Sequence, residues 1–422
     1  MQEELIHHLW KLKTFDHRNL KTICDKPIKI FKYGTYNLNA GPDFINALIK
    51  INDTEWAGHV EMHVKSSDWI AHRHHTDKAY NSVILHVVYT HDKEVKTENG
   101  SKPYTLELKS RTPSILLERY KSLLGNKLYV PCQNMIQKLD ENLIKVYMDQ
   151  LLCERLKRKH NKVNTLLDNS KYDWEHVCYA LIMKYVGLKV NRNAFEMLTN
   201  YVPYRLLIRV ADKRYKMEAL LLGQAGLLNK CPDQYTQKLR KEYEHLRTKY
   251  KLKSMQGLEW KLARMRPSSF PTIRISQLCS LYHNHTYLFR KIIENPSVSI
   301  IHKLLEQPTS NYWKEHYLPG NSSKSINKQI GLQARNVLIC NAIIPLIFSY
   351  ACISGKHDLK SRALEMYHEI TAEKNKLIKF WDTLGLKSKS AADSQALIEL
   401  KTQYCDQYKC LNCSIGYNIL YK

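Results

Sequence analysis

Short runs of alternating apolar and polar residues fill the first 110 residues of the chain, as expected for half-buried strands. After an amphipathic helix over residues 3–13, this pattern predicts strands over 28–33, 43–51, 54–65, 83–90 and 104–109, with a short helix over 76–82. Asn52 and Asp53 interrupt the alternation between the second and third of these strands. Such a turn signal predicts that the two strands form a hairpin.

From residue 112 onward the apolar spacing becomes helical. Helices are predicted over 114–124, 140–160, 174–185, 193–201, 205–210, 213–228 and 233–250, with breaks at Gly187, Pro203 and Pro232. We find no convincing strand pattern here and no repeat of fixed length. Because 422 residues exceed the usual size of one domain, we predict an α+β protein with two domains. A mixed α/β domain would cover residues 1–130, and a larger all-α domain would cover 131–422.

The chain is expected to remain in the cytoplasm and to cross no membrane. Its longest apolar run, residues 337–353, contains Cys340, Asn341, Pro345 and Ser349, which predicts a buried helix rather than a membrane span. The N-terminus has no basic region followed by an apolar stretch and a cleavage site. The 11 cysteines, scattered and odd in number, suit a reducing compartment.

The candidate chemistry gathers in the predicted hairpin. Asp43 follows a Gly-Pro turn and opens one strand, while Glu61, His63 and Lys65 lie two residues apart in the next. That spacing places the last three side chains on one face of their strand. Two neighbouring strands would then bring two carboxylates, an imidazole and an ammonium into one small volume. Carboxylates hold a magnesium ion that polarises a phosphate and activates water, so the pattern favours phosphodiester hydrolysis.

Three histidines after this hairpin are further candidates. His72 and His74 lie in a polar loop behind Trp69, where they could be metal ligands, a proton shuttle or solvated surface. His86 alternates with Leu85 and Val87 in an apolar strand. It would face either the candidate site or the core.

These residues resemble the PD-(D/E)xK nuclease superfamily. The resemblance rests on the Pro-Asp43 pair that opens a strand, on Glu61 in the next strand with a basic residue two positions on, and on the order of the elements. It implies a restriction-endonuclease-like N-terminal domain in which Asp43 and Glu61 bind magnesium or manganese. His63 stands where that pattern has its lysine, and Lys65, one pleat further along the same face, would replace it.

A second resemblance covers nearly the whole chain. The phrases GPDFINA, GHVEMH, YNSVILHVVY, GLKVNRNAF, RPSSFPTIRI and the terminal YCDQYKCLNCSIG resemble an uncharacterised bacterial family of a domain of unknown function. This resemblance is specific for family membership and implies no activity.

The charge of the chain favours a polyanionic partner. Its 65 Lys and Arg exceed its 40 Asp and Glu, which gives a net charge of +25 and suits nucleic acid. Lys-rich chains from AT-rich genomes reach such a charge without binding anything, so charge alone does not decide. Arg264, Arg266 and Arg274 lie around a turn with two prolines and Phe270, where they would contact DNA or RNA or else form a solvated surface.

A second constellation lies near the C-terminus. Cys405, Cys410 and Cys413 are brought together in a short, turn-prone segment after a helix. A tetrahedral zinc ion or an iron-sulfur cluster requires a fourth ligand, for which Cys132 is the best candidate. His316 or His368 could instead complete a zinc site, and the remaining alternative is cysteines that pack as small apolar residues.

The sequence therefore favours a metal-dependent nuclease acting on DNA or RNA. In such an enzyme Lys65 or His63 would assist water activation, and His72, His74 or His86 would move protons or add a ligand. One alternative is a catalytically inactive nucleic-acid-binding or scaffold protein that retains the fold. Another is a metal-dependent hydrolase of a small phosphate compound. The sequence leaves the oligomeric state open.

Overall fold

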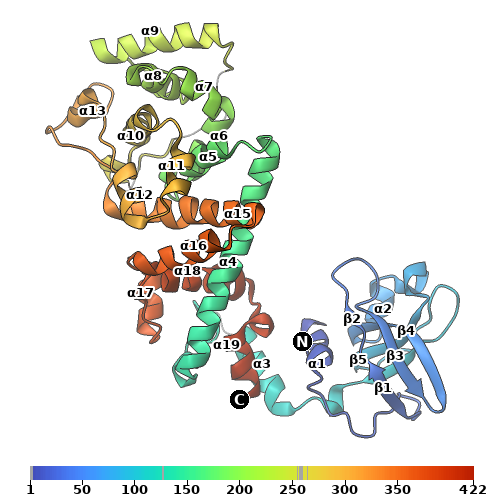
Figure 1. Ribbon diagram of the computed structural model, residues 1–422. Coiled ribbons are helices and arrows are strands. Elements are labelled where there is room, and N and C mark those ends of the chain that lie inside the picture. Colours follow the sequence, from blue (N-terminus) through green and yellow to red (C-terminus); the bar gives the residue numbers. More distant parts are fainter. Residues whose placement is uncertain (1–2, 126–127, 254, 256–259, 264) are drawn as a thin grey trace. The chain divides into compact units, whose positions relative to one another are not determined.

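The computed structural model describes residues 3–125, 128–253, 255, 260–263 and 265–422 (Figure 1). The chain forms two compact units. The first comprises Met1–Ile144 with Lys401–Lys422, and the second comprises Lys145–Leu400. This division differs from the expected domains of 1–130 and 131–422.

The reason for the difference is the C-terminal segment. Its helix α19, Ser414–Tyr421, packs on α3, Ser114–Gly125, in the N-terminal unit. The guanidinium of Arg119 on α3 donates to the carbonyls of Ile419 and Leu420 at 3.4 and 3.2 Å. It thereby satisfies carbonyls at the end of a helix that have no partner within it. Lys401–Lys422 thus belong to the N-terminal unit.

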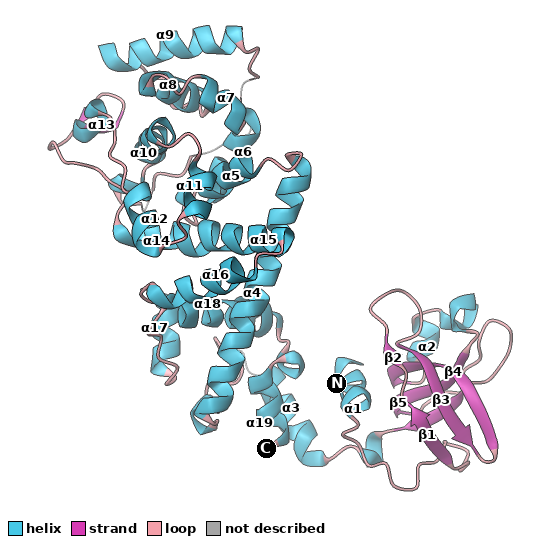
Figure 2. Cartoon of the chain, viewed as in Figure 1, coloured by secondary structure: helices cyan, strands magenta, loops and turns pink. Residues whose placement is uncertain are grey.

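A six-stranded mixed sheet forms the framework of the N-terminal unit (Figure 2). The strands are β1 Ile28–Lys32, β2 Thr35–Tyr36, β3 Phe44–Ile51, β4 Thr54–Lys65, β5 Val83–Thr90 and β6 Tyr104–Glu107. Their order is β1-β3-β4-β5-β6, and β2 pairs with β3. The pairs β1/β3 and β3/β4 are antiparallel, so the predicted hairpin is confirmed, while β4/β5 and β5/β6 are parallel.

Helices and turns position the polar end of this sheet. Helix α1, Glu3–Leu12, buries Leu5, Ile6, Leu9 and Trp10 and contacts β4. The connection from β4 to β5 contains α2 Asp68–Ala71 and two 3₁₀ turns, η1 His74–Thr76 and η2 Lys78–Tyr80, in place of the one helix expected over 76–82. Trp69 of α2 is fully buried against Tyr80, so this connection is held against the sheet.

The second unit is mostly helical, as predicted, and the α+β class is confirmed (Figure 2). Its helices are α4 Glu141–Asn169, which begins just before the unit, α5 Trp174–Val186, α6 Arg192–Tyr201, α7 Tyr204–Arg209, α8 Arg214–Gln224, α9 Gln234–Lys249, α10 Pro271–Asn284, α11 Leu288–Glu294, α12 Val298–Leu305, α13 Asn311–Glu315, α14 Leu332–Leu338, α15 Ile344–Ser354, α16 His357–Glu369, α17 Lys376–Thr383 and α18 Ala391–Glu399.

The expectation that this part contains no strand was wrong. Two short strands, β7 His316–Leu318 and β8 Asn321–Ser322, form an antiparallel hairpin. The turn between them contains Pro319 and Gly320, and Gly320 adopts a φ of 72° that glycine accepts at little cost. The pair is too short for the alternation of apolar residues to reveal it.

The longest apolar run forms a core helix. Among the described residues, one helix, Leu332–Ser354, is long and apolar enough to cross a membrane, but 67% of its most apolar window is buried inside the protein. Such burial is typical of a core helix.

A π turn, η6 Ile339–Ile343, separates α14 from α15 in this run. Pro345 has no N–H to donate to the carbonyl of Asn341 four residues earlier. Instead, Lys159 Nζ donates to that carbonyl at 3.2 Å and to Asn341 Oδ1 at 3.0 Å. The ammonium therefore takes the place of the missing backbone donor.

Candidate functional site

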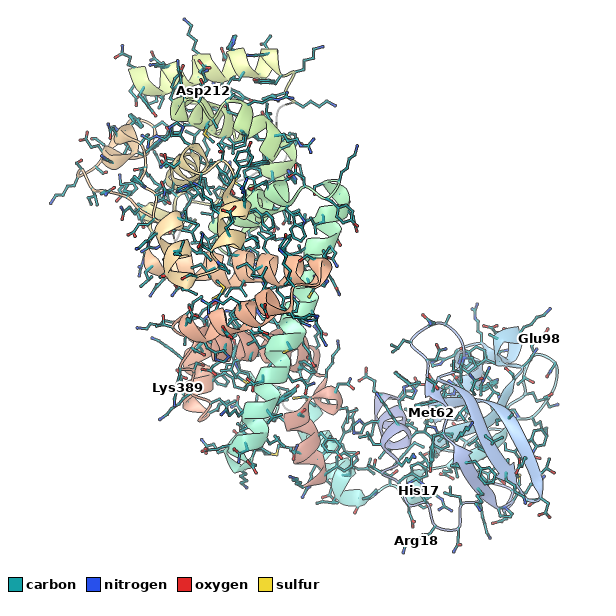
Figure 3. All side chains as sticks on the ribbon, viewed as in Figure 1. His17, Arg18, Met62, Glu98, Asp212 and Lys389 are labelled. Carbon is teal, nitrogen blue, oxygen red and sulfur yellow. The ribbon has the colours of Figure 1, made fainter. Side chains whose placement is uncertain are left out.

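Asp43 and Glu61 are fixed beside each other by backbone hydrogen bonds. The N–H of Met62, which is labelled in Figure 3, donates to Asp43 Oδ2 at 2.9 Å. The N–H of Asp43 donates to Glu61 Oε2 at 3.1 Å. These bonds follow from the register of the hairpin, in which Phe44 of β3 pairs with Val60 of β4. The structure thus brings the two predicted carboxylates together.

Helix α1 adds a carboxylate and an imidazole to this pair. Glu3 and His7 are one turn apart, and His7 Nε2 lies 3.2 Å from Asp43 Oδ2. The candidate ligand atoms of Glu3, His7 and Asp43 all lie within 4.8 Å of one another. We call these three residues the acidic triad.

A second group of three ligands lies next to it. The candidate ligand atoms of His63, His72 and His74, which we call the histidine triad, also lie within 4.8 Å of one another. Glu61 Oε1 is 3.8 Å from His63 Nε2 and 3.1 Å from His74 Nε2. His63 Nε2 is also 3.9 Å from Glu3 Oε1 of the acidic triad. Glu61 therefore lies between the two triads and contacts both.

His86 orients the His63 ring through a hydrogen bond. On β5, His86 is fully buried, and its Nε2 lies 2.8 Å from His63 Nδ1 in a hydrogen bond. The register that pairs Glu61 with His86 creates this contact. A metal-binding histidine is usually oriented by a hydrogen bond from its other ring nitrogen, and His86 provides such a partner.

Negative charge is crowded around the acidic triad. Burial and the charge of Asp43 raise the pKa of Glu61 to about 9. Burial, followed by the charge of Asp43, also raises the pKa of Glu3. Burial alone would lower the pKa of His7, but its contact with Asp43 and the charges of Asp43 and Glu3 raise it overall. A bound cation would relieve this crowding of carboxylates.

Burial keeps the imidazoles of His63, His74 and His86 uncharged at neutral pH. Burial, reinforced by His86, lowers the pKa of His63 to about 2. Burial also lowers the pKa of His74 and brings that of His86 to about 3. Neutral imidazoles have the lone pairs that metal ions bind.

Two buried nitrogens support metal binding directly. His74 Nε2 has no hydrogen-bond partner among the described residues, although it lies 3.1 Å from Glu61 Oε1, and His7 Nε2 lies 3.2 Å from Asp43 Oδ2. The donor set combines carboxylates, which suit magnesium and manganese, with imidazoles, which suit transition-metal ions rather than magnesium.

The family of the chain can now be stated. Residues 3–376 match the model of a family described as "Protein of unknown function (DUF2851)", which is most of the 422 residues. The chain belongs to the DUF2851 family. Neither the curated proteins nor the solved structures include a significant match to it. The matched range includes both triads, whereas Cys405, Cys410 and Cys413 lie beyond it.

Lys65 does not join the triads of this DUF2851 protein. It lies at the exposed end of β4, opposite Thr90. His63, which stands in the position expected for a catalytic lysine, is buried and uncharged at neutral pH. Neither Lys65 nor His63 therefore supplies the basic group that was predicted beside the two carboxylates.

The three arginines expected to bind nucleic acid do not form one surface. Arg264 lies outside the described residues, and Arg266 is exposed. Arg274 is buried on α10, where it donates to Gln277 Oε1 at 3.0 Å and to Ser269 Oγ at 3.3 Å. Burial lowers its pKa to about 10. The predicted contact of Arg274 with nucleic acid is wrong, because its guanidinium faces the interior.

Glu3 and His7 are the site residues that the sequence patterns missed. Their spacing of four places them on one face of an amphipathic helix, and this was the available signal. Tyr80 stacks on His74 with ring centroids 3.8 Å apart. It therefore supports the histidine triad through packing.

Proposed function

We propose that this DUF2851 protein is a manganese-dependent hydrolase of phosphodiester bonds in nucleic acid. The observation that carries the proposal is the adjacency of the acidic and histidine triads, with the Glu61 carboxylate between them. Structural ion pairs rarely gather three carboxylates and several neutral imidazoles in one place, since burying like charges is costly.

The residues of the two triads have separable tasks in this proposal. Glu3, His7, Asp43 and Glu61 would hold the ion, and a residue of the histidine triad would move protons or add one further ligand. A bound divalent ion supplies charge stabilisation at the phosphate and lowers the pKa of a bound water. The backbone bonds to Asp43 and Glu61 keep both carboxylates oriented before substrate arrives.

The choice of substrate rests on charge. A net charge of +25 attracts a polyanion and speeds its association at low salt. Asp43 is 21% exposed at its side chain, so this edge of the acidic triad is open to solvent. We place the protein in the cytoplasm, where its many thiols would remain reduced.

A catalytically inactive nucleic-acid-binding protein is the second candidate. The position of Lys65 favours it, because the ammonium that the nuclease pattern expects beside the carboxylates belongs to an exposed residue at the end of β4. Such a protein would bind DNA or RNA with a strong dependence on salt and would cut neither.

The direct test is a cleavage assay on single-stranded and duplex DNA and RNA. We expect cleavage in Mn²⁺ that is about tenfold faster than in Mg²⁺, because of the imidazole ligands. Binding without cleavage in either metal would contradict the enzyme and favour the inactive protein. Absence of both binding and cleavage would reject nucleic acid as the ligand.

Replacing His86 tests how the histidine triad is positioned. His86→Phe keeps a ring in the core of β5 but removes the hydrogen bond to His63, so Mn²⁺ affinity should fall about 10- to 100-fold. His86→Gln, which retains an acceptor, should restore part of that affinity. Isothermal titration with Mn²⁺ measures both.

The matched control for this prediction is His59→Phe. His59 is also a strand histidine, but it contacts the N–H of Asn46 rather than either triad. Its replacement should leave Mn²⁺ affinity unchanged. Equal affinity in His86→Phe and the intact protein would show that His86 only fills space.

A further inference from the structure

Four cysteines, one of them distant in sequence from the other three, are buried within the N-terminal unit. Cys132, Cys405, Cys410 and Cys413 are 7, 8, 8 and 5% exposed, respectively. His316 and His368, the alternative ligands, belong to the helical unit instead.

The local backbone of the three late cysteines forms a compact double turn. Two 3₁₀ turns, Cys405–Gln407 and Cys410–Asn412, are separated by Tyr408, whose φ of 52° reverses the chain. The N–H of Cys413 donates to the carbonyl of Cys410 at 3.3 Å. These turns fold the segment that contains the three cysteines back on itself.

Helix α19 closes this turn by a very close approach. A Cβ atom on Gly416 would lie 2.1 Å from the carbonyl oxygen of Cys410, so only glycine fits there. Cys413 immediately precedes the helix as its N-cap residue. The packing therefore fixes the positions of Cys410 and Cys413 relative to each other.

The segment that contains Cys132 meets the segment of the late cysteines through Tyr129, whose ring centroid lies 4.2 Å from Lys401 Nζ. Burial, followed by the neighbouring thiols of Cys413 and Cys410, raises the pKa of Cys132 to about 12. The pKa of Cys405 is raised by burial and by the other three thiols. Burial and Cys413 raise the pKa of Cys410 to about 11.

We propose that Cys132, Cys405, Cys410 and Cys413 bind one metal centre through four thiolates. Four sulfur ligands are typical of a structural zinc ion or of an iron-sulfur cluster. A positive metal would stabilise the buried thiolates and release their protons. This centre is independent of the proposed hydrolase and uses none of the residues of its two triads.

The centre would hold the C-terminal segment of the N-terminal unit, Lys401–Lys422, against the part of the unit that contains α3. Cys132 follows α3, while the other three ligands precede or cap α19, so one metal would join both sides of the α3/α19 contact. Lys401 forms an ion pair with Asp406 and lies over the Tyr129 ring, 4.2 Å from its centroid. Tyr129 lies just before Cys132, and Lys401 lies just before Cys405. Their contact therefore joins the two segments that contain the proposed ligands.

The test is metal analysis of the full chain after anaerobic purification. We expect one zinc ion per chain if the centre is a zinc site. If it is an iron-sulfur cluster, we expect iron and sulfide in equal amounts and a broad absorption at about 400 nm. Either result supports a four-thiolate centre and identifies it. Less than about 0.1 equivalent of both metals, together with no uptake of added Zn²⁺ by the reduced protein, would overturn the proposal.

Cys132→Ser is the decisive variant, because it leaves the late cysteines intact. It should lower bound metal at least about tenfold and expose the segment after residue 400 to limited proteolysis. Cys279→Ser, which changes an equally buried cysteine of the helical unit, is the control and should keep full metal content. Full metal content in Cys132→Ser would also overturn the four-cysteine assignment.

Discussion

Asp43→Asn and Glu61→Gln should each lower metal-dependent cleavage about 10³-fold, because each removes a charged ligand from between α1 and the sheet. Both variants retain an acceptor for the backbone hydrogen bond that their carboxylate now receives. The amide oxygen introduced at position 43 would still accept the N–H of Met62, and the one introduced at position 61 would still accept the N–H of Asp43. The loss should therefore appear in kcat with little change in thermal unfolding.

Asp53→Asn is the matched control for these variants. Asp53 lies in the turn of the same hairpin and its side chain is fully exposed beside Lys50. Its replacement should leave cleavage unchanged. If Asp43→Asn and Glu61→Gln cleave as fast as this control, the activity comes from elsewhere in the chain or from a contaminant.

Glu399→Gln should lower the free energy of unfolding of the helical unit by about 3–5 kcal/mol. Glu399 is 2% exposed and accepts hydrogen bonds from Arg155 at 3.1 Å and from Arg158 at 2.7 Å. Removing its charge leaves the buried Arg155 without a counter-ion, and among the described residues that guanidinium has only Asn341 as a further acceptor. Urea unfolding followed by circular dichroism measures the change.

The effect of Glu399 should depend on pH in a defined direction. Burial alone would raise the pKa of Glu399, but Arg158 and Arg155 lower it overall. A carboxyl with a lowered pKa stabilises the fold above the unfolded pKa of about 4.3, and this contribution disappears as pH falls through the folded pKa. The difference between the intact protein and Glu399→Gln should therefore shrink in acid.

An exposed ion pair provides the comparison for this network. Glu365 pairs with Arg362 at 3.4 Å, and its side chain is 64% exposed. Glu365→Gln should change stability by less than about 0.5 kcal/mol. If Glu399→Gln is as mild as Glu365→Gln, the buried network contributes little to the fold.

The sheet was predictable because its strands carry local signals. Alternation in 54–65 and the apolar run in 83–90 define β4 and β5 with the bounds found in the structure. The turn residues Asn52 and Asp53 defined the hairpin, and the hairpin register then aligned Asp43 with Glu61. That part of the site required contacts only between neighbouring strands.

The remaining site depends on packing that periodicity does not encode. Glu3 and His7 reach Asp43 only because α1 packs on β4, across many intervening residues. Arg274 was misjudged because its flanking prolines suggested a surface turn, whereas α10 is buried from Pro271 to Tyr282. A charged residue on a helix that is buried on all sides must find its hydrogen-bond acceptors inside the protein.

The most direct test of the central claim is Mn²⁺ binding followed by electron paramagnetic resonance. The intact protein should remove free Mn²⁺ signal with a saturable stoichiometry, and Asp43→Asn should weaken that binding at least about tenfold. Cys132→Ser should bind Mn²⁺ as the intact protein does, since thiolates prefer other metals. Equal Mn²⁺ binding by the intact protein and Asp43→Asn, or none by either, would contradict a metal site between α1 and the β3/β4 hairpin.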